Sequence, residues 1–165
     1  KEQFLSERYD SIYSKTGAGA IFTFLSMAIS WPIRIAFWSL FVMLTANLFL
    51  GGGGKYGQMF TISAFAYLPS VVEYIIKTPI QFITDNIMIF TGLGVLGIGE
   101  QGDFINSFLA GVDIFAFWRV FIVAVGVGIL YNKSTKTALA TMTALWIFGL
   151  IVFAGIGAGA KGIFG

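Results

Sequence analysis

Long apolar segments, separated by short polar or glycine-rich turns, dominate the chain. The clearest segments cover residues 32–50, 58–77, 108–131 and 136–157. Each is close to the ~20 apolar residues that an α-helix needs to cross the hydrocarbon core of a bilayer. The pattern therefore predicts an all-α fold, a polytopic transmembrane helical bundle with four to five spans.

Two stretches allow alternative interpretations. Residues 18–50 form either one long helix that kinks at Pro32, or a short interfacial helix followed by a span from residue 32; we favour the second. Residues 79–98 begin with a proline that is typical of a helix N-terminus. We expect a fifth membrane element there, which is tilted, broken or fully spanning, and a kink at Pro69 in the segment before it.

Residues 1–16 are the most polar part of the chain. Their apolar side chains have the spacing of one helix face, at Phe4, Leu5, Tyr9, Ile12 and Tyr13. This predicts an amphipathic helix, which either lies in the membrane interface or links the bundle to whatever precedes it. Residues 17–165 are predicted to be a single transmembrane domain.

Composition supports a membrane location and excludes several functions. Hydrophobic residues make up 57% and charged residues 11% of the chain, whereas a soluble domain has about 25% charged residues. The chain has no His and no Cys, which removes the commonest general base, the usual zinc ligands and disulfides. It has no basic run that would favour nucleic acid. We expect no enzymatic activity, no cofactor and no metal.

Three glycines at Gly92, Gly94 and Gly97 match the pattern G-x-G-x-x-G. A dinucleotide site requires this pattern between a strand and a helix, and here it ends an apolar membrane segment. We therefore interpret these glycines as positions of close packing or as a flexible segment end.

Ionisable residues inside apolar segments are costly in lipid, so they usually face the bundle interior and form pairs. The candidates for an intramembrane polar cluster are Glu73, Asp113 and Arg119, and we predict an interhelix pair between Arg119 and Glu73. The cluster serves as a structural clamp, as a transport or proton pathway, or is merely interfacial. Trp31 and Arg34 are predicted to lie at the headgroup level, with Arg34 snorkelling.

Small residues four apart predict helix packing, because they let two helices approach closely. Ala124 and Gly128 form one such pair, and Gly155 and Gly159 form another. The spacing indicates contacts within the bundle or between copies in a homo-oligomer, and it does not separate the two.

The distribution of Lys and Arg among the turns predicts an orientation, because cytoplasmic loops carry an excess of these residues. With five crossings, one side would hold six of them: Lys1, Arg8, Lys15, Lys77, Lys133 and Lys136. The other side would hold Lys55 and Lys161. This puts the N-terminus and the 132–136 turn together in the cytoplasm.

Several segments together resemble the Yip-type family, which is named for eukaryotic members that interact with Rab-like GTPases. They occur in this order: Ala-Tyr-Leu-Pro at 66–69, Gly-Val-Asp-Ile-Phe-Ala-Phe-Trp at 111–118, Ala-Val-Gly-Val-Gly at 124–128, a polar turn at 132–137, and Trp146 in the last segment. The resemblance covers roughly residues 57–155.

The resemblance implies a polytopic protein of about five spans without catalytic activity. Eukaryotic members work in ER–Golgi traffic with prenylated GTPases and carry an acidic Asp-Leu-Tyr-Gly-Pro-type motif. This chain has no such motif, which argues against GTPase binding. It looks more like a prokaryotic member in the cytoplasmic membrane, acting as a scaffold or accessory subunit that binds another membrane protein in trafficking or export. The alternative is a small transporter or channel-like protein.

Overall fold

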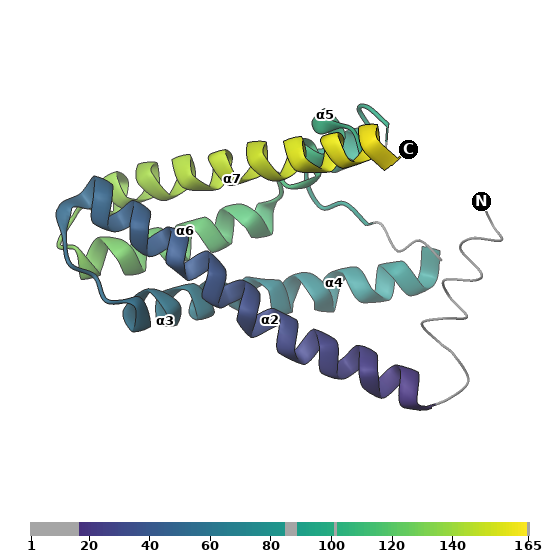
Figure 1. Cartoon of the computed structure of the whole chain (residues 1–165), viewed down its shortest axis with the longest axis horizontal. Coiled ribbons are helices and arrows are strands. Elements are labelled where there is room, and N and C mark those ends of the chain that lie inside the picture. The colour runs from purple at the N-terminus through teal and green to yellow at the C-terminus, as the bar shows by residue number, and fades with distance from the viewer. Residues whose placement is uncertain (1–16, 85–88, 101, 165) are drawn as a thin grey trace. The chain divides into compact units, whose positions relative to one another are not determined.

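A computed structural model describes residues 17–84, 89–100 and 102–164, and it is built of helices (Figure 1). The predicted amphipathic helix at 1–16 lies outside the described residues. The α-helices are α2 (Gly17–Ala46), α3 (Tyr56–Ala66), α4 (Leu68–Thr84), α5 (Phe104–Ala110), α6 (Ile114–Leu130) and α7 (Thr135–Phe164). A π-helical turn, η1 (Asn47–Gly51), follows α2, and a 3-10 turn, η2 (Leu93–Leu96), precedes α5. The all-α prediction is confirmed.

Helix α2 is one helix of 30 residues, and Pro32 lies inside it. The favoured arrangement, in which a short interfacial helix ends before residue 32, was therefore wrong. A proline inside a helix removes one helical hydrogen bond and costs about 3 kcal/mol, whereas ending one helix and starting another would leave up to four N–H and four C=O groups without intrahelical partners. The continuous helix through Pro32 therefore loses fewer backbone hydrogen bonds than two separate helices would.

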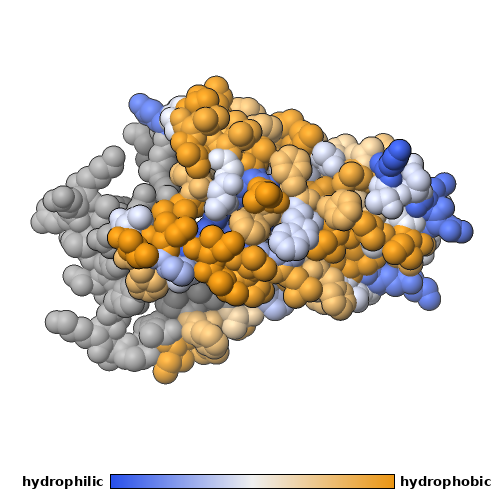
Figure 2. Space-filling model, turned by 180° about the vertical axis from the view of Figure 1, so that it is seen from behind, coloured by the Kyte–Doolittle hydropathy of each residue, from blue (hydrophilic) through white to orange (hydrophobic). Residues whose placement is uncertain are grey.

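Three helical segments are long and apolar enough to cross a membrane: Phe24–Gly51, Tyr56–Thr84 and Thr135–Gly159. The 17 residues of α6 form a shorter apolar helix. Large apolar side chains are widely exposed on these helices, such as Phe41 of α2, Ile75 of α4 and Phe153 of α7. Figure 2 shows a broad hydrophobic surface beside hydrophilic side chains at one end. Because water would not tolerate this surface, the protein is an integral membrane protein.

The second apolar segment contains a break at Tyr67, which separates α3 from α4. Pro69 lies in the first turn of α4, where a missing backbone N–H costs least. Pro79 lies inside α4, which continues to Thr84. The predicted restart of a helix at residue 79 was therefore wrong. Residues 89–98 contain only η2 as regular structure, so the described part of the predicted membrane element at 79–98 holds no spanning helix of its own.

The predicted span at 108–131 is divided in two. Residues 108–110 end the short helix α5, and α6 begins at Ile114, after its N-cap residue Asp113. The Asp113 carboxylate accepts a hydrogen bond of 2.6 Å from the backbone N–H of Ala116. Asp113 therefore lies at a helix start, where its negative charge complements the helix dipole, and not inside the span as we expected.

Helices α6 and α7 form an antiparallel hairpin and pack side by side (Figure 1). Ala124 is fully buried. A Cβ atom added at Gly128 would lie 3.3 Å from the carbonyl oxygen of Lys133 and 3.4 Å from the Cβ of Ala138. This pair of small residues therefore packs inside the chain, against the start of α7. Around Gly155 and Gly159 an added Cβ would meet nothing within 4 Å in the part of the chain that the structure describes.

The turns after α2 and α6 are tied together at one end of the bundle. The Asn47 carboxamide oxygen accepts hydrogen bonds from the Gly54 N–H, at 3.0 Å, and from the Tyr131 hydroxyl, at 2.5 Å. A Cβ atom at Gly52 would lie 2.6 Å from the Tyr131 ring, so glycine is needed there for the close approach. Burial raises the pKa of Tyr131 above its ordinary value of 10.0, which keeps its hydroxyl a donor.

This contact overturns the predicted orientation, because Lys55 and the 132–136 turn were expected on opposite sides. The described part of the segment 79–98 holds no spanning helix of its own, which changes the expected side of the turns after it. Within the described residues, the candidates for crossings are four: α2, α3 with α4, α6, and α7. At the opposite end, an added Cβ at Gly111, after α5, would touch Leu150, and one at Gly157 would meet Ser107, so α5 covers the C-terminal half of α7.

Candidate functional site

One face of α4 carries the polar side chains from which the site is built. Glu73, Lys77 and Gln81 are spaced four residues apart, which places them one above another along the helix. Ser70 begins the same stripe and is buried. Large apolar side chains of α4, such as Ile75 and Phe82, are exposed. The helix is therefore amphipathic, with its polar face turned toward the rest of the bundle.

Glu73 lies at the centre of an ion network that we define by Glu73, Lys77, Asp113 and Arg119. One carboxylate oxygen of Glu73 is 2.5 Å from the Lys77 ammonium, and the other is 2.9 Å from Nη1 of Arg119. Lys77 is also 4.0 Å from Asp113. The four side chains are 11–27% exposed, so the network is mostly buried.

The contact of Arg119 with Glu73 is the interhelix pair that we predicted. It joins α6 to α4, and Arg119 also donates a 3.0 Å hydrogen bond to the Ser70 hydroxyl. Asp113 and Arg119 lie on one helix without contacting each other directly, and Lys77 links Asp113 to Glu73. The three residues of the predicted cluster are thus brought together through a fourth one.

Lys77 and Ser70 were missed as members of the site. Lys77 was placed at the end of the predicted span 58–77, before the expected helix start at Pro79, and was counted only among the charges that set the orientation. The signal that could have found it is its spacing of four from Glu73, with the acidic residue on the N-terminal side, which is the favourable order in a helix. Reading the helix through Pro79 would have placed both charges on the same face.

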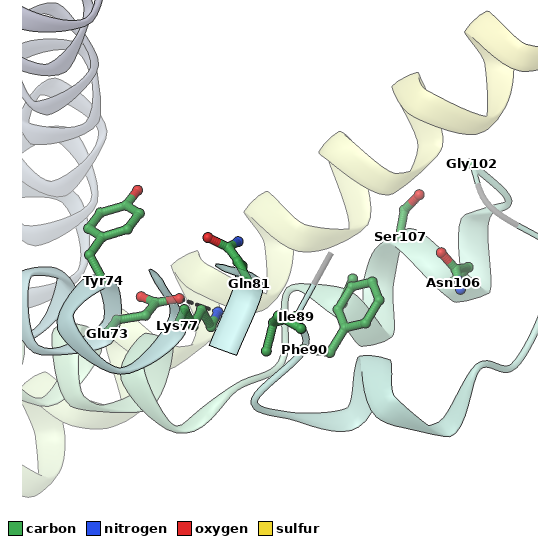
Figure 3. A pocket seen from close by; sticks show the side chains of 10 residues that line it. Glu73, Tyr74, Lys77, Gln81, Ile89, Phe90, Gly102, Asn106 and Ser107 are labelled. Carbon is green, nitrogen blue, oxygen red and sulfur yellow. Dashed lines mark hydrogen bonds and ion pairs between the residues drawn. The ribbon is translucent and has the colours of Figure 1, made fainter. Parts of the chain in front are cut away.

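A pocket of about 460 Å³ opens beside the network. Its α4 wall is made by Glu73, Tyr74, Lys77 and Gln81, its α5 wall by Asn106, Ser107 and Ala110, and Ile89, Phe90 and Gly102 complete it. Figure 3 shows Ile89 and Phe90 between the α4 side chains and the α5 side chains. The volume is within the ~300–1,000 Å³ of small-molecule sites.

Two glycines of the G-x-G-x-x-G pattern position the segment that carries Ile89 and Phe90 of the pocket. Gly92 pairs with Asp113 in a single antiparallel bridge, and an added Cβ would collide with the Val112 carbonyl oxygen. An added Cβ at Gly94 would lie 2.5 Å from the Phe90 ring. These glycines therefore allow the segment after residue 89 to pack closely on the start of α6.

The chemistry available to the network is limited by its own ion pairs. Its two positive and two negative charges balance, and each group faces a group of opposite charge. Within the described residues, no three His, Cys, Asp or Glu side chains lie together as metal ligands would. The arrangement is suited to fixing α4 against α6 and to presenting a neutral pair of opposite charges in the pocket.

The predicted interfacial pair lies elsewhere, in the middle of α2. The Arg34 guanidinium carbon is 5.8 Å from the centroid of the Trp31 ring, which is within cation–π range. Arg34 is 17 residues before Gly51, which corresponds to about 25 Å of helix. Its position at the far headgroup level stays a prediction.

Comparison with known families agrees with this architecture. The family model of the Yip1 domain matches residues 4–156. The chain belongs to the Yip1 domain family. This confirms the resemblance seen in the sequence and extends it over nearly the whole chain. No curated protein and no solved structure matches it significantly.

Membership in the Yip1 domain family places the chain among membrane proteins that are generally non-enzymatic. The ion network and its pocket are features of this chain's own structure.

Proposed function

We propose that this Yip-type protein is a non-enzymatic scaffold or accessory subunit, which binds another membrane protein through its helices. The observation that carries the proposal is the open face of α7 around Gly155 and Gly159. Glycine inside a helix costs about 1 kcal/mol relative to alanine. Gly128 offsets this cost by packing closely within the chain, but a Cβ atom added at Gly155 or Gly159 would meet no described residue within 4 Å. Contact with a helix of another molecule would let these glycines support close helix packing, as Gly128 does within the chain.

The ion network supports this proposal from inside the bundle. It fixes α4 against α6 through the Glu73–Arg119 contact, and α6 in turn packs on α7. A partner would therefore meet a helix surface that is held in one position. We expect the setting to be a prokaryotic cytoplasmic membrane, with a role in export or trafficking. A second copy of the chain would use the same face.

The test uses the whole protein purified in a mild detergent. We expect a membrane protein, or a second copy, to co-purify in a fixed ratio and to be lost when Gly155 and Gly159 are both replaced by leucine. Gly57→Leu is the matched control, since Gly57 is also an exposed glycine with nothing within 4 Å. Retention of the partner by the double variant, measured by native mass spectrometry, would contradict the proposal.

A second candidate function, a small transporter, is favoured by the polar pocket next to Glu73 and Lys77. Ionisable groups within a span often mark a substrate pathway. Liposomes that contain only this protein would then take up amino acids or inorganic ions faster than empty liposomes. Equal uptake by both would remove this candidate, and uptake lost in Lys77→Gln would favour it over the scaffold.

A further inference from the structure

The depth of the pocket in the membrane follows from the length of α6. Its 17 residues span about 26 Å, slightly less than the ~30 Å hydrocarbon core. One end of α6 is Tyr131, at the polar turns. The other end is Asp113, and Lys77 lies 4.0 Å from its carboxylate. Lys77 is therefore near the opposite boundary of the hydrocarbon, at the level where lipid headgroups begin.

The elements beyond this level form an interfacial layer made of α5, η2, the end of α4 and the end of α7. The layer exposes apolar side chains, such as Leu96 of η2 and Ile105 of α5. Such side chains favour the boundary between headgroups and acyl chains. The pocket lies between α4 and α5, so it opens where the polar part of a lipid meets its chains.

The walls of the pocket offer groups of both charges. The Lys77 ammonium has three N–H donors, of which one meets Glu73. Each carboxylate oxygen of Glu73 accepts one bond from a cation and has lone pairs for another. Asn106 and Ser107 on the α5 wall add an amide and a hydroxyl. Tyr74 and Phe90 supply apolar surface for the first part of an acyl chain.

We propose that this pocket binds the headgroup of a zwitterionic phospholipid, with its phosphate at Lys77 and its ammonium at Glu73. The balanced charge of the ion network selects the charge type. A ligand with a net charge would be left uncompensated in a partly desolvated site, and this is costly. A headgroup with one phosphate and one ammonium adds no net charge and matches the opposite charges of the wall.

The test is native mass spectrometry of the detergent-solubilised protein with added lipids at equal concentrations. We expect phosphatidylethanolamine to be retained about ten times better than phosphatidylglycerol or diacylglycerol, since one charge-assisted contact is worth about 1.5 kcal/mol. Equal or better retention of phosphatidylglycerol would overturn the choice of a zwitterionic lipid. Displacement of the lipid by equimolar soluble phosphoethanolamine would show that the acyl chains contribute nothing, and would overturn a lipid as the source.

Two variants locate the lipid. Lys77→Gln removes the phosphate contact, and Ala110→Leu fills the pocket while leaving every ion pair in place. Both are expected to reduce retention of phosphatidylethanolamine about tenfold, whereas Ile105→Phe, on an exposed position of the same helix α5, should not. Unchanged retention in Ala110→Leu would overturn the site even if Lys77→Gln failed to fold. None of these outcomes bears on partner binding at Gly155 and Gly159.

Discussion

Removing one member of the ion network should destabilise the bundle by an amount that depends on how many partners are left behind. Glu73→Leu leaves two cations, Lys77 and Arg119, without the carboxylate that they share. Arg119→Leu leaves Glu73 still paired with Lys77 at 2.5 Å. The loss of Glu73 is therefore expected to cost more than the loss of Arg119.

The magnitudes follow from the partial burial of the network. Breaking a fully buried ion pair costs about 3–5 kcal/mol, and an exposed pair is worth about 0–1 kcal/mol. Glu73 is 13% and Arg119 27% exposed, which places both between these limits. We expect about 3 kcal/mol for Glu73→Leu and about 2 kcal/mol for Arg119→Leu. The double variant should lose about 1–2 kcal/mol less than the two single losses added together.

The assay is reversible unfolding in mixed detergent micelles, followed by the fluorescence of the four tryptophans and by helical circular dichroism. Lys133→Ala is the control partner for Glu73→Leu, because Lys133 is an exposed residue of the polar turn at the other end of α6. That pair should be additive. Additive losses for Glu73 and Arg119, within about 0.5 kcal/mol, would refute the contact. A larger loss for Arg119→Leu than for Glu73→Leu would refute the role of Lys77 as a second partner.

Three further predictions concern the packing and the end turns. Gly128→Leu should cost about 2–3 kcal/mol by forcing α6 from the start of α7, measured by the same unfolding assay, and no loss would contradict the close packing. Tyr131→Phe should cost about 1 kcal/mol through its bond to Asn47, and amide exchange at Gly54 should become faster; unchanged exchange would argue against the tie. The chain has no cysteine, so single cysteines at Lys55 and Ser134 can be labelled from one side of sealed vesicles. Both should react from the same side, and opposite reactivity would contradict four crossings.

The fold class could be predicted from the sequence, because the apolar segments are long and charges are rare. The helix boundaries could not be predicted from the prolines. Pro32 and Pro79 lie inside continuous helices, although the general rule treats an interior proline as a break. That rule considers only the missing hydrogen bond at the proline. Ending one helix and starting another leaves up to four N–H and four C=O groups without intrahelical partners, so one interior proline can cost less than a break.

The candidate site was predictable in part, because unpaired charges are costly in lipid. Glu73 and Arg119 stood out as charges in apolar segments, and the cost of leaving them unpaired predicted their contact. Lys77 did not stand out, since its recognition depended on the helix continuing past Pro79. The pocket also depends on Ile89 and Phe90, whose segment packs closely on the start of α6 through Gly92 and Gly94. Local patterns carry no information about such a contact between distant segments.

The contact between Glu73 and Arg119 has a consequence for biosynthesis, where helices enter the membrane one after another. A single charge at the centre of a helix costs about 2.5–3.5 kcal/mol at the translocon. Glu73 leaves the ribosome early and has Lys77 on the next turn of its own helix, so α4 can enter lipid with its charges already matched. Arg119 follows 46 residues later and has no acidic residue within its own helix α6. The Glu73 carboxylate is by then already in the membrane. The order of synthesis therefore gives each charge a partner of opposite sign when its helix inserts.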